Sequence, residues 1–570
     1  MDDRDDRTAL RQLQQALGDG SAAGAAHKRT LLTRLLRARF ERAADLRALQ
    51  RAICFLRAFP DYARIERLAR TLAVGFAARV ARLPARERAP LDDSGMAGTV
   101  TRHVFGFAAA RWLAARCPGA VAIDWRNVES PAALADVLQP LLDPMEDEYI
   151  ELDDAGVRDW LRRARGGRRA TRDGELVWLL AQAPAAGAAA RRFAVGYEAA
   201  AVPLSWRIDD RRAITGNRWP QPLALRAGGL RRPAADPRAA ITQPLRTARL
   251  LPRRAAARLL DVWRAALWSR TRTVFQVEQP NLDECWLCDF GAGLQMAAIG
   301  VRPGLRSTLE ATYGYLLLAN GMPIGYGGFT TLFAQVNTGI NVFPEYRGGE
   351  AAFAFEQALR AMHTLTGCVH VIVNPYQFGA GNDEALASGA YWFYYRLGFR
   401  SVTGAVDRIA RREFARLGAD RGYRVPVATL RKLAACDLRL DLGEGTDTLF
   451  DEAWLPAIGR GITAAIARVP ERNRGRALAR LSAHIAAALG LDRARLDART
   501  RAALARFAPI LAQVDDLAAW PAAERRALAD LVRLREAPTE REFVARLRAH
   551  VRLREALARA GRQALAAADG

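Results

Sequence analysis

The sequence predicts an α/β (α+β) fold in which a mixed sheet is flanked by helical domains at both ends of the chain. Three observations predict it. Apolar residues recur at helical spacing through residues 8–83 and again through most of residues 417–570. Extended apolar runs bounded by turn residues fill the stretch between Leu294 and Val373. The length of 570 residues exceeds what one hydrophobic core holds, so several domains are expected.

The first half of the chain predicts a helical bundle followed by a mixed region. Residues 1–95 carry Leu, Ile and Phe at helical spacing with arginines between them, as in LLTRLLRARFERAADLRALQRAICFLRAF, which favours three or four amphipathic helices. Residues 96–249 predict further helices around a short strand at Val121–Trp125. From Trp219 onward this region is rich in proline and arginine and is expected to be a linker or a wrapping segment.

Residues 250–416 carry the strands of the predicted sheet domain. The run YGYLLLANGMPIGYGGF contains two extended segments that meet at Asn320-Gly321. A two-residue turn between strands needs positive φ at both of its residues, which Asn and Gly tolerate, so a β-hairpin is expected here. Further strands are expected at Val336–Phe343 and Cys368–Val373.

A glycine-rich turn, Arg347–Ala352, follows the first of these strands and opens a helix. Such a turn exposes unpaired backbone N–H groups at the positive end of the helix dipole, which is a natural seat for a phosphate. Glu350 brings a carboxylate to this seat. Its side chain either occupies the seat and repels phosphate or points outward and caps the helix, and the sequence leaves both arrangements open.

A polar loop, Asn374–Gly389, follows the strand at Cys368–Val373 and leads into the helix AYWFYYRLGF, which contains Tyr394. Loops at the ends of strands commonly carry recognition residues. The tyrosine is either part of an aromatic stripe that packs in the core or a proton donor.

The order of hairpin, strand, RGGEAA turn, strand and AYWFYYRLGF helix resembles the GNAT superfamily of acyl-CoA-dependent N-acyltransferases, over about residues 250–416. The 374–389 loop is similar to a segment of large bacterial proteins of unassigned function that have a GNAT-like half. The resemblance implies that the strands at 336–343 and 368–373 are parallel and splayed. It also implies that the Asn320-Gly321 hairpin walls the acceptor cleft.

The resemblance also implies the roles of individual residues. Backbone groups at Ile340, Val342 and Phe343 would align the pantetheine of an acyl-CoA, and Tyr394 would protonate the leaving thiolate. The pyrophosphate seat would comprise Arg347, Gly348, Gly349, Glu350 and Ala351. Glu350 stands where the family has a glycine, and Ala387 stands where it usually has an asparagine.

Three carboxylates are candidates for the general base that deprotonates the acceptor amine, namely Glu384, Glu310 and Asp383. No spacing assigns the role to one of them, and each is equally compatible with a capping or surface position. No metal is expected. The lone pair Cys285 and Cys288 lacks a second pair at zinc spacing and predicts buried, inert thiols.

The resemblance implies a GNAT-like N-acyltransferase that moves an acyl group from acetyl-CoA or another acyl-CoA to an unknown amine, by direct attack in a ternary complex. The alternative is a non-catalytic GNAT-fold scaffold or interaction protein with a degenerate cofactor site. The expected partners are therefore an acyl-CoA and an amine acceptor.

The net charge of +24 indicates little about recognition. Only Lys28 and Lys432 among the 85 basic residues are lysines, leaving 83 arginines, which is typical of a GC-rich coding bias. Specific nucleic-acid binding is not expected on this basis, because no aromatic-basic module accompanies the charge. The first residues, MDDRDDRTALRQL, are acidic, and no apolar run approaches about 20 residues. A cytoplasmic protein that does not enter a membrane is expected.

Overall fold

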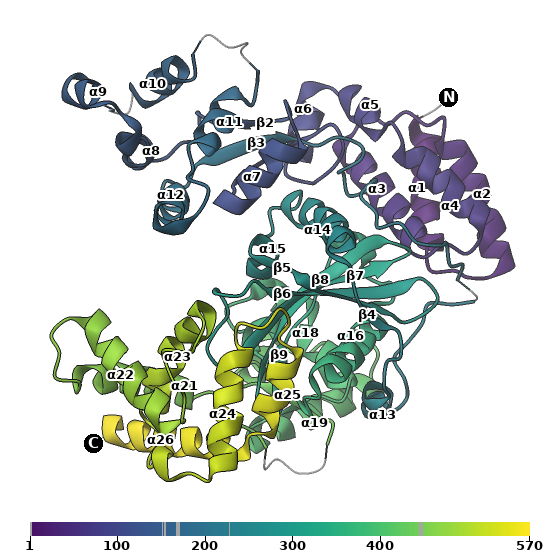
Figure 1. Ribbon diagram of the computed structural model, residues 1–570. Coiled ribbons are helices and arrows are strands. Elements are labelled where there is room, and N and C mark those ends of the chain that lie inside the picture. The colour runs from purple at the N-terminus through teal and green to yellow at the C-terminus, as the bar shows by residue number, and fades with distance from the viewer. Residues whose placement is uncertain are drawn as a thin grey trace.

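The computed structural model describes residues 3–150, 152, 156–166, 171–226, 228–443 and 448–569. The fold is mixed α/β, with a large sheet at its centre, N-terminal helices above it in the view of Figure 1 and C-terminal helices below it. Among the described residues, no helix combines the length and the apolar character that crossing a bilayer requires.

The N-terminal residues form the expected helical bundle. Its helices bury one face each; α3, for example, buries Leu46, Leu49, Ile53 and Leu56 at spacings of three and four residues. The helices are α1 (Asp3–Ala16), α2 (Ala22–Leu35), α3 (Ala43–Ala58), α4 (Ala63–Ala73), α5 (Phe76–Ala81) and α6 (Ala85–Arg88), with a 3-10 turn, η1 (Ala89–Leu91).

The next region is built on a small antiparallel sheet of order β1-β3-β2. Its strands are β1 (Val100–Val104), β2 (Val121–Ile123) and β3 (Pro203–Arg207), so the strand expected at Val121–Trp125 is confirmed. The helices here are α7 (Phe107–Arg116), α8 (Pro131–Leu138), η2 (Gln139–Leu141), α9 (Pro144–Tyr149), α10 (Gly156–Ala164), α11 (Gly174–Ala181) and α12 (Gly187–Ala199).

The large sheet has ten strands in the described part of the chain, in the order β12-β13-β11-β9-β8-β7-β6-β5-β4, with β10 paired to β8. All neighbours are antiparallel except β9 and β11, whose parallel pairing confirms the prediction for these two segments. The strands are β4 (Ala248–Leu250), β5 (Pro280–Asp289), β6 (Leu294–Val301), β7 (Ala311–Ala319), β8 (Met322–Leu332), β9 (Gln335–Thr338), β10 (Asn341–Val342), β11 (His370–Val373), β12 (Arg400–Ser401) and β13 (Leu438–Asp441).

Strand β13 lies in a stretch that the sequence predicted to be helical. Leu438, Leu440 and Leu442 alternate with polar residues, and all three are buried. This period of two suits a strand with one covered face. The sheet therefore extends past residue 416 and includes a strand from the C-terminal part of the chain.

Helices cover both faces of the sheet. In Figure 1, α14 (Arg253–Trp268) and α15 (Phe275–Glu278) lie above it, whereas α16 (Ala351–Thr366) and α25 (Arg541–Ala549) lie below it, and contacts with the strands agree. Every residue of β6 is buried. A strand buried on both sides needs apolar residues at successive positions, as in its sequence LQMAAIGV.

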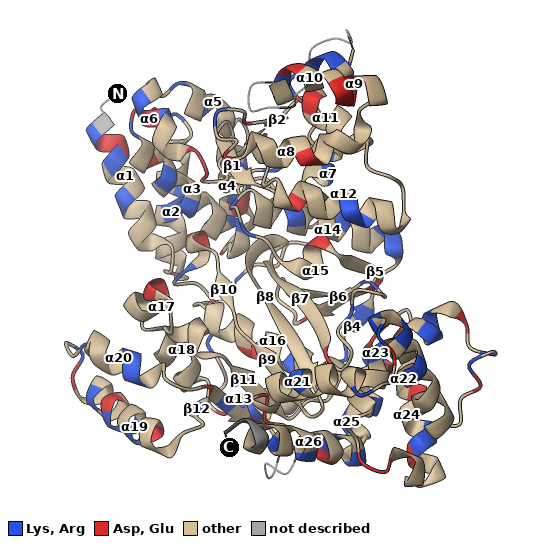
Figure 2. Cartoon of the chain, turned by 90° about the vertical axis from the view of Figure 1, so that its left-hand side faces the viewer, with Lys and Arg blue, Asp and Glu red and all other residues tan. Residues whose placement is uncertain are grey.

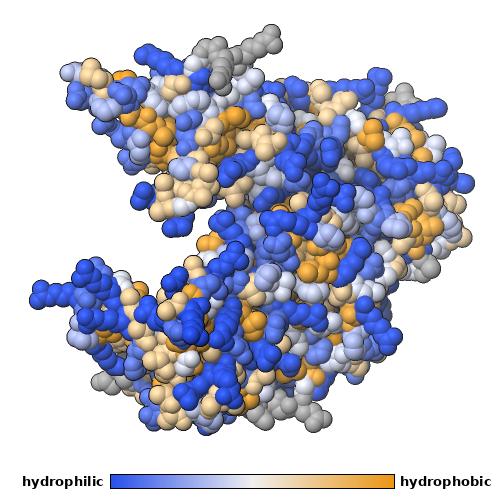
Figure 3. Space-filling view, in the orientation of Figure 1, coloured by the Kyte–Doolittle hydropathy of each residue, from blue (hydrophilic) through white to orange (hydrophobic). Residues whose placement is uncertain are grey.

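The remaining helices fall into two groups. Around the β9–β11 end of the sheet lie η3 (Pro344–Tyr346), η4 (Pro375–Phe378), α17 (Asp383–Ser388), α18 (Ala390–Arg396), α19 (Gly404–Ala419) and α20 (Val427–Leu433). The C-terminal domain has a core of its own and contains α21 (Trp454–Ala467), α22 (Arg474–Ala488), α23 (Ala498–Leu511), η5 (Leu517–Ala519), α24 (Ala522–Leu534), α25 and α26 (Val551–Asp569). Figure 3 shows a hollow between this domain and the lobe that carries α8–α12.

A buried charge network joins the C-terminal domain to the sheet. Arg306 lies 3.6 Å from Glu284 of β5 and 3.5 Å from Glu540, and Arg535 pairs with Glu540. The Tyr313 hydroxyl donates a hydrogen bond to Glu284 over 2.8 Å. All four charged side chains are essentially inaccessible, so each depends on its partner for solvation.

The segment from Trp219 to Leu250 wraps around the domains, as its composition predicts, and its described part includes the short helix α13 (Pro237–Thr242). Arg226 donates a hydrogen bond to Asp61 of the N-terminal bundle over 2.8 Å. Further along, Arg360 of α16 donates to the Gln243 carbonyl over 2.8 Å. The wrapping segment thereby ties the bundle to the sheet domain.

The Asn320-Gly321 hairpin is confirmed, with φ of +48° and +78° at the two turn residues. Its tip is buried rather than open. The Asn320 amide donates to the carbonyls of Ala58 and Ala224, and the Trp219 N–H donates to the Gly321 carbonyl over 2.9 Å. The wrapping segment therefore covers the turn that was expected to wall a cleft.

We expect Gly321→Ala to destabilise the protein more than Gly348→Ala, although both glycines have positive φ. A Cβ at Gly321 would lie 2.0 Å from the Trp219 carbonyl oxygen, whereas a Cβ at Gly348 would have no atom within 4 Å. The backbone cost alone is about 1–2 kcal/mol at either position, and only Gly321→Ala adds a collision. Urea unfolding of both variants measures the difference, and equal losses would contradict it.

Candidate functional site

The candidate site lies where the paired strands β9 and β11 separate. Their parallel pairing ends at Asn337 and Ile372. The chain then passes through Gly339 and Ile340 without ladder pairing, and β10 resumes pairing with β8 in the same register. The Phe343 N–H donates a hydrogen bond to the Ile324 carbonyl of β8. In an antiparallel pair, successive residues point their N–H and C=O groups alternately toward and away from the partner strand. Those of Val342 therefore point away from β8. The N–H and C=O of Val342 therefore point to the side of β10 on which β11 lies, and the place where β9 and β11 part is called the opening below.

Tyr394 of α18 reaches the unpaired residues Gly339 and Ile340 from within the core. Its side chain is buried, and its hydroxyl accepts a hydrogen bond from the Ile340 N–H over 3.5 Å. The Tyr315 hydroxyl donates to the neighbouring Gly339 carbonyl over 2.6 Å. Burial raises the pKa of Tyr394 well above its usual value, so its proton is retained throughout the neutral range.

Gln377 of η4, in the loop that follows β11, lies against Gly339. A Cβ added to Gly339 would lie only 2.4 Å from the Gln377 amide carbon. The Gln377 side chain thus occupies the space next to Gly339, and a larger residue at position 339 would require that side chain to move. The loop that the sequence marked for recognition does reach the opening between the strands.

The Arg347–Glu350 turn leads from η3 into α16. Gly348 has φ of +83° and open space around it, whereas Gly349 packs against the Phe59 ring, with 2.9 Å between a built Cβ and the ring edge. The side chain of the N-cap residue, Glu350, makes no capping hydrogen bond to α16. Its first N–H groups therefore remain as potential donors to an anion beside Gly348.

Glu350 takes neither of the two arrangements that the sequence left open. The side chain is 3% exposed and points to the wrapping segment, where it accepts hydrogen bonds from the Arg231 N–H over 3.0 Å and from Arg231 Nε over 2.7 Å. The Arg231 guanidinium also lies 4.7 Å from the Phe353 ring. The carboxylate forms an ion pair with Arg231. It accepts no capping hydrogen bond from the N–H groups at the start of α16.

The predicted carboxylate bases do not assemble around Tyr394. Glu384 of α17 is exposed and pairs with Arg347, and the hydrogen bond from that guanidinium lowers the pKa of Glu384, which weakens it as a base. Asp383 is exposed at the start of the same helix. The polar loop thus contributes an ion pair at the rim of the opening.

Glu310 lies at the opposite end of the sheet strands from Tyr394. Glu310 immediately precedes Ala311, the first residue of β7. Ala311 pairs with Thr331 of β8, and Thr331 pairs with Val336 of β9, so Glu310 lies level with the beginning of β9. Ile340 lies beyond the other end of β9, roughly 13 Å further along at about 3.3 Å per residue. Burial raises the pKa of Glu310, but the structure does not bring it to the candidate site.

Three residues that shape the site were not identified from the sequence: Phe59, Arg231 and Gln377. Arg231 is one of many arginines in a proline-rich segment, and Phe59 comes from a separate helical bundle. Gln377 lies in the loop already marked for recognition, so its position in the chain was the only available signal.

Cys285 and Cys288 are buried in β5, as the sequence predicts for an isolated pair. Burial raises the pKa of both thiols to about 12. Few thiolates form at neutral pH as a result, and the pair takes no part in the candidate site.

Comparison of the chain with family models, curated proteins and solved structures gives no match.

We expect the two partners of the buried ion pair to respond unequally to substitution. Arg231→Gln leaves the inaccessible Glu350 carboxylate without its counter-charge and should cost about 3 kcal/mol, the lower end of the range for breaking a buried pair, because Arg231 is 28% exposed. Glu350→Gln leaves an arginine that can reach water and should cost about 1–2 kcal/mol. Urea unfolding measures both losses.

The matched control is Arg232→Gln, which changes an exposed arginine next to Arg231 and should leave the unfolding midpoint unchanged. A larger loss for Glu350→Gln than for Arg231→Gln would show that the carboxylate is solvated by other groups.

We also expect the buried thiols to resist alkylation in the native protein. Iodoacetamide at neutral pH should modify the half-buried Cys436 first, and Cys285 and Cys288 only after unfolding, because alkylation requires the thiolate and access to it. Mass spectrometry of native and urea-unfolded samples measures this order. Modification of Cys285 or Cys288 as fast as Cys436 would contradict it.

Proposed function

We propose that the chain is a GNAT-like N-acyltransferase that uses an acyl-CoA and an amine acceptor. The observation that carries the proposal is the Tyr394 hydroxyl at the Ile340 N–H, beside two parallel strands that diverge. This arrangement offers a strand edge and a proton donor at one opening. The sequence resemblance implies the same roles for the same residues.

The groups around the opening suit the parts of an acyl-CoA. The free N–H and C=O of Val342 would bind the amide groups of the pantetheine, as a strand edge binds an extended chain. The uncapped N-terminus of α16, open beside Gly348, would hold the pyrophosphate, with Arg347 at its rim. Since Glu350 is engaged by Arg231, its charge lies outside this seat.

The residues present support transfer by direct attack of a neutral amine on the thioester. The Tyr394 hydroxyl accepts the Ile340 N–H, so its own proton would go to the leaving thiolate, and the tyrosinate would recover the proton that the attacking amine releases. Burial raises the pKa of Tyr394, which makes it a weaker acid than an exposed phenol. The proposal assigns no carboxylate base, since Glu384 is held ionised by Arg347 and Glu310 lies at the other end of β9.

A second candidate function, a scaffold that retains the fold without catalysis, is favoured by a different observation. Side chains of the protein itself lie at three places around the opening: Gln377 against Gly339, Phe59 against Gly349, and Arg231 on Glu350. If they stay in place, an acyl-CoA has less room, and the wrapping segment serves only to hold the domains together.

The distribution of charge favours neither candidate and supports no specific nucleic-acid interface. Figure 2 shows lysines and arginines spread over the N-terminal bundle, the small-sheet lobe and the C-terminal helices, with acidic residues among them. We propose that the excess of arginine acts as a diffuse positive field, which attracts polyanions such as an acyl-CoA without recognising a sequence.

Calorimetric titration of coenzyme A tests the proposal. The wild type should bind, and Arg347→Ala should weaken binding by about 1–3 kcal/mol, which is roughly 5–150-fold in Kd, through loss of a charge-assisted contact. Tyr394→Phe should leave binding unchanged but slow acyl transfer to a panel of primary amines by about a hundredfold or more.

Arg408→Ala is the matched control, because it removes an equivalent exposed positive charge from α19. A uniform weakening in both arginine variants would show that only the diffuse field attracts coenzyme A. Absence of binding to the wild type would leave the scaffold function in place of the transferase.

A further inference from the structure

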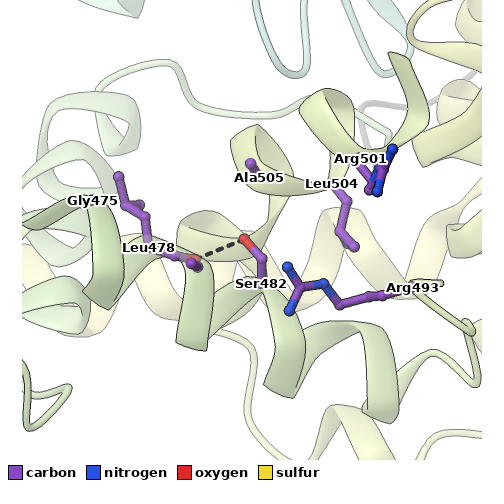
Figure 4. Close-up of a pocket in the computed structure, with 8 residues that line it drawn as sticks. Gly475, Leu478, Ser482, Arg493, Arg501, Leu504 and Ala505 are labelled. Atoms are coloured by element: carbon purple, nitrogen blue, oxygen red, sulfur yellow. Dashed lines mark hydrogen bonds between the residues drawn. The ribbon is translucent and has the colours of Figure 1, made fainter. Parts of the chain in front are cut away.

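A pocket remote from the candidate site in sequence lies between α22 and α23 of the C-terminal domain, and Figure 4 shows it in close-up. Its volume is about 200 Å³. The residues that line it are Gly475, Leu478, Ala479, Ser482, Arg493, Arg501, Leu504 and Ala505.

The walls of this pocket are apolar. Leu504 is buried at its base and Leu478 is half-buried opposite, with the alanines Ala479 and Ala505 on the outer rim. Ser482 supplies the one hydroxyl in the lining, and that hydroxyl donates to the Leu478 carbonyl over 2.7 Å. The walls therefore offer a ligand little besides contact with hydrocarbon.

Two arginines provide charge at the mouth. Arg493 extends from the loop between the two helices so that its guanidinium lies beside Ser482, and Arg501 projects from α23 (Figure 4). Both side chains are exposed, and neither forms an ion pair with any residue in the described part of the chain.

The nearest acidic residues are committed elsewhere. Asp492 pairs with Arg495 over 3.3 Å. Asp497 accepts the Thr500 N–H as the N-cap of α23, and that hydrogen bond lowers the pKa of Asp497. The two guanidinium groups thus present uncompensated positive charge above an apolar pocket.

We propose that the pocket between α22 and α23 binds a small amphipathic anion, a monocarboxylate with a short aliphatic chain. A guanidinium fork matches a carboxylate in shape and charge, and an aliphatic chain would displace water from the walls formed by Leu478 and Leu504. A volume of about 200 Å³ suits a chain of medium length better than a drug-sized ligand. This site is independent of the transferase proposal.

Calorimetric titration with octanoate tests the site. Octanoate should bind, hexanoate should bind more weakly by about fourfold for each methylene removed, and octylamine should not bind, because its charge has the wrong sign. Inorganic phosphate should not compete with octanoate. Competition by phosphate, or no octanoate binding at all, would overturn the proposal.

Variants locate the binding. The double variant Arg493→Ala/Arg501→Ala should weaken octanoate binding at least tenfold, and Ala479→Leu should also weaken it by filling the outer pocket. Arg468→Ala/Arg472→Ala is the matched control, because it removes two exposed arginines of the same domain outside the pocket and should leave affinity unchanged. Thermal melts verify that each variant is folded.

Arg347→Ala separates this site from the proposed transferase site. It should leave octanoate affinity unchanged whether or not it alters coenzyme A binding. Octanoate binding that depends on Arg347, or that survives both pocket variants, would show that the ligand binds elsewhere and would refute the assignment.

Discussion

Burial of the central sheet on both faces is the constraint on which the other domains depend. Strand β6 has every residue buried, and β7 and β8 are nearly as inaccessible. Such strands expose backbone and apolar side chains to water unless helices cover both sides. The chain meets this requirement with α14 and α15 on one face and with α16 and α25 on the other, so one helix of the C-terminal domain helps to cover the sheet.

Covering the sheet in this way brings charged groups into the interior, where each needs a partner. Glu284 meets Arg306 and Tyr313 beneath the C-terminal domain, and Glu350 meets Arg231 beneath the wrapping segment. Removing one member of such a pair costs more than the pair contributes, because a charge is left in low dielectric. These contacts therefore fix how the domains are placed on the sheet more than they add to stability.

The candidate site results from the same packing. The opening between β9 and β11 exists because the two strands pair over only three residues and then follow different partners. Tyr394 is brought to it by an aromatic core that includes Phe355, Phe378 and Phe399. Residues from the wrapping segment and the N-terminal bundle then narrow it, so access to the proposed acyl-CoA site and the docking of those segments are physically linked.

The sequence by itself determined the local elements: the Asn320-Gly321 turn, the strand at Leu294–Val301 and the helix after Arg347. Turn chemistry and hydrophobic period act between near neighbours, so they can be inferred without a structure. Only long-range packing placed Glu350 against Arg231, 119 positions away along the chain, and brought Tyr394 to Ile340, 54 positions away. No local pattern in the sequence encodes contacts between residues so far apart.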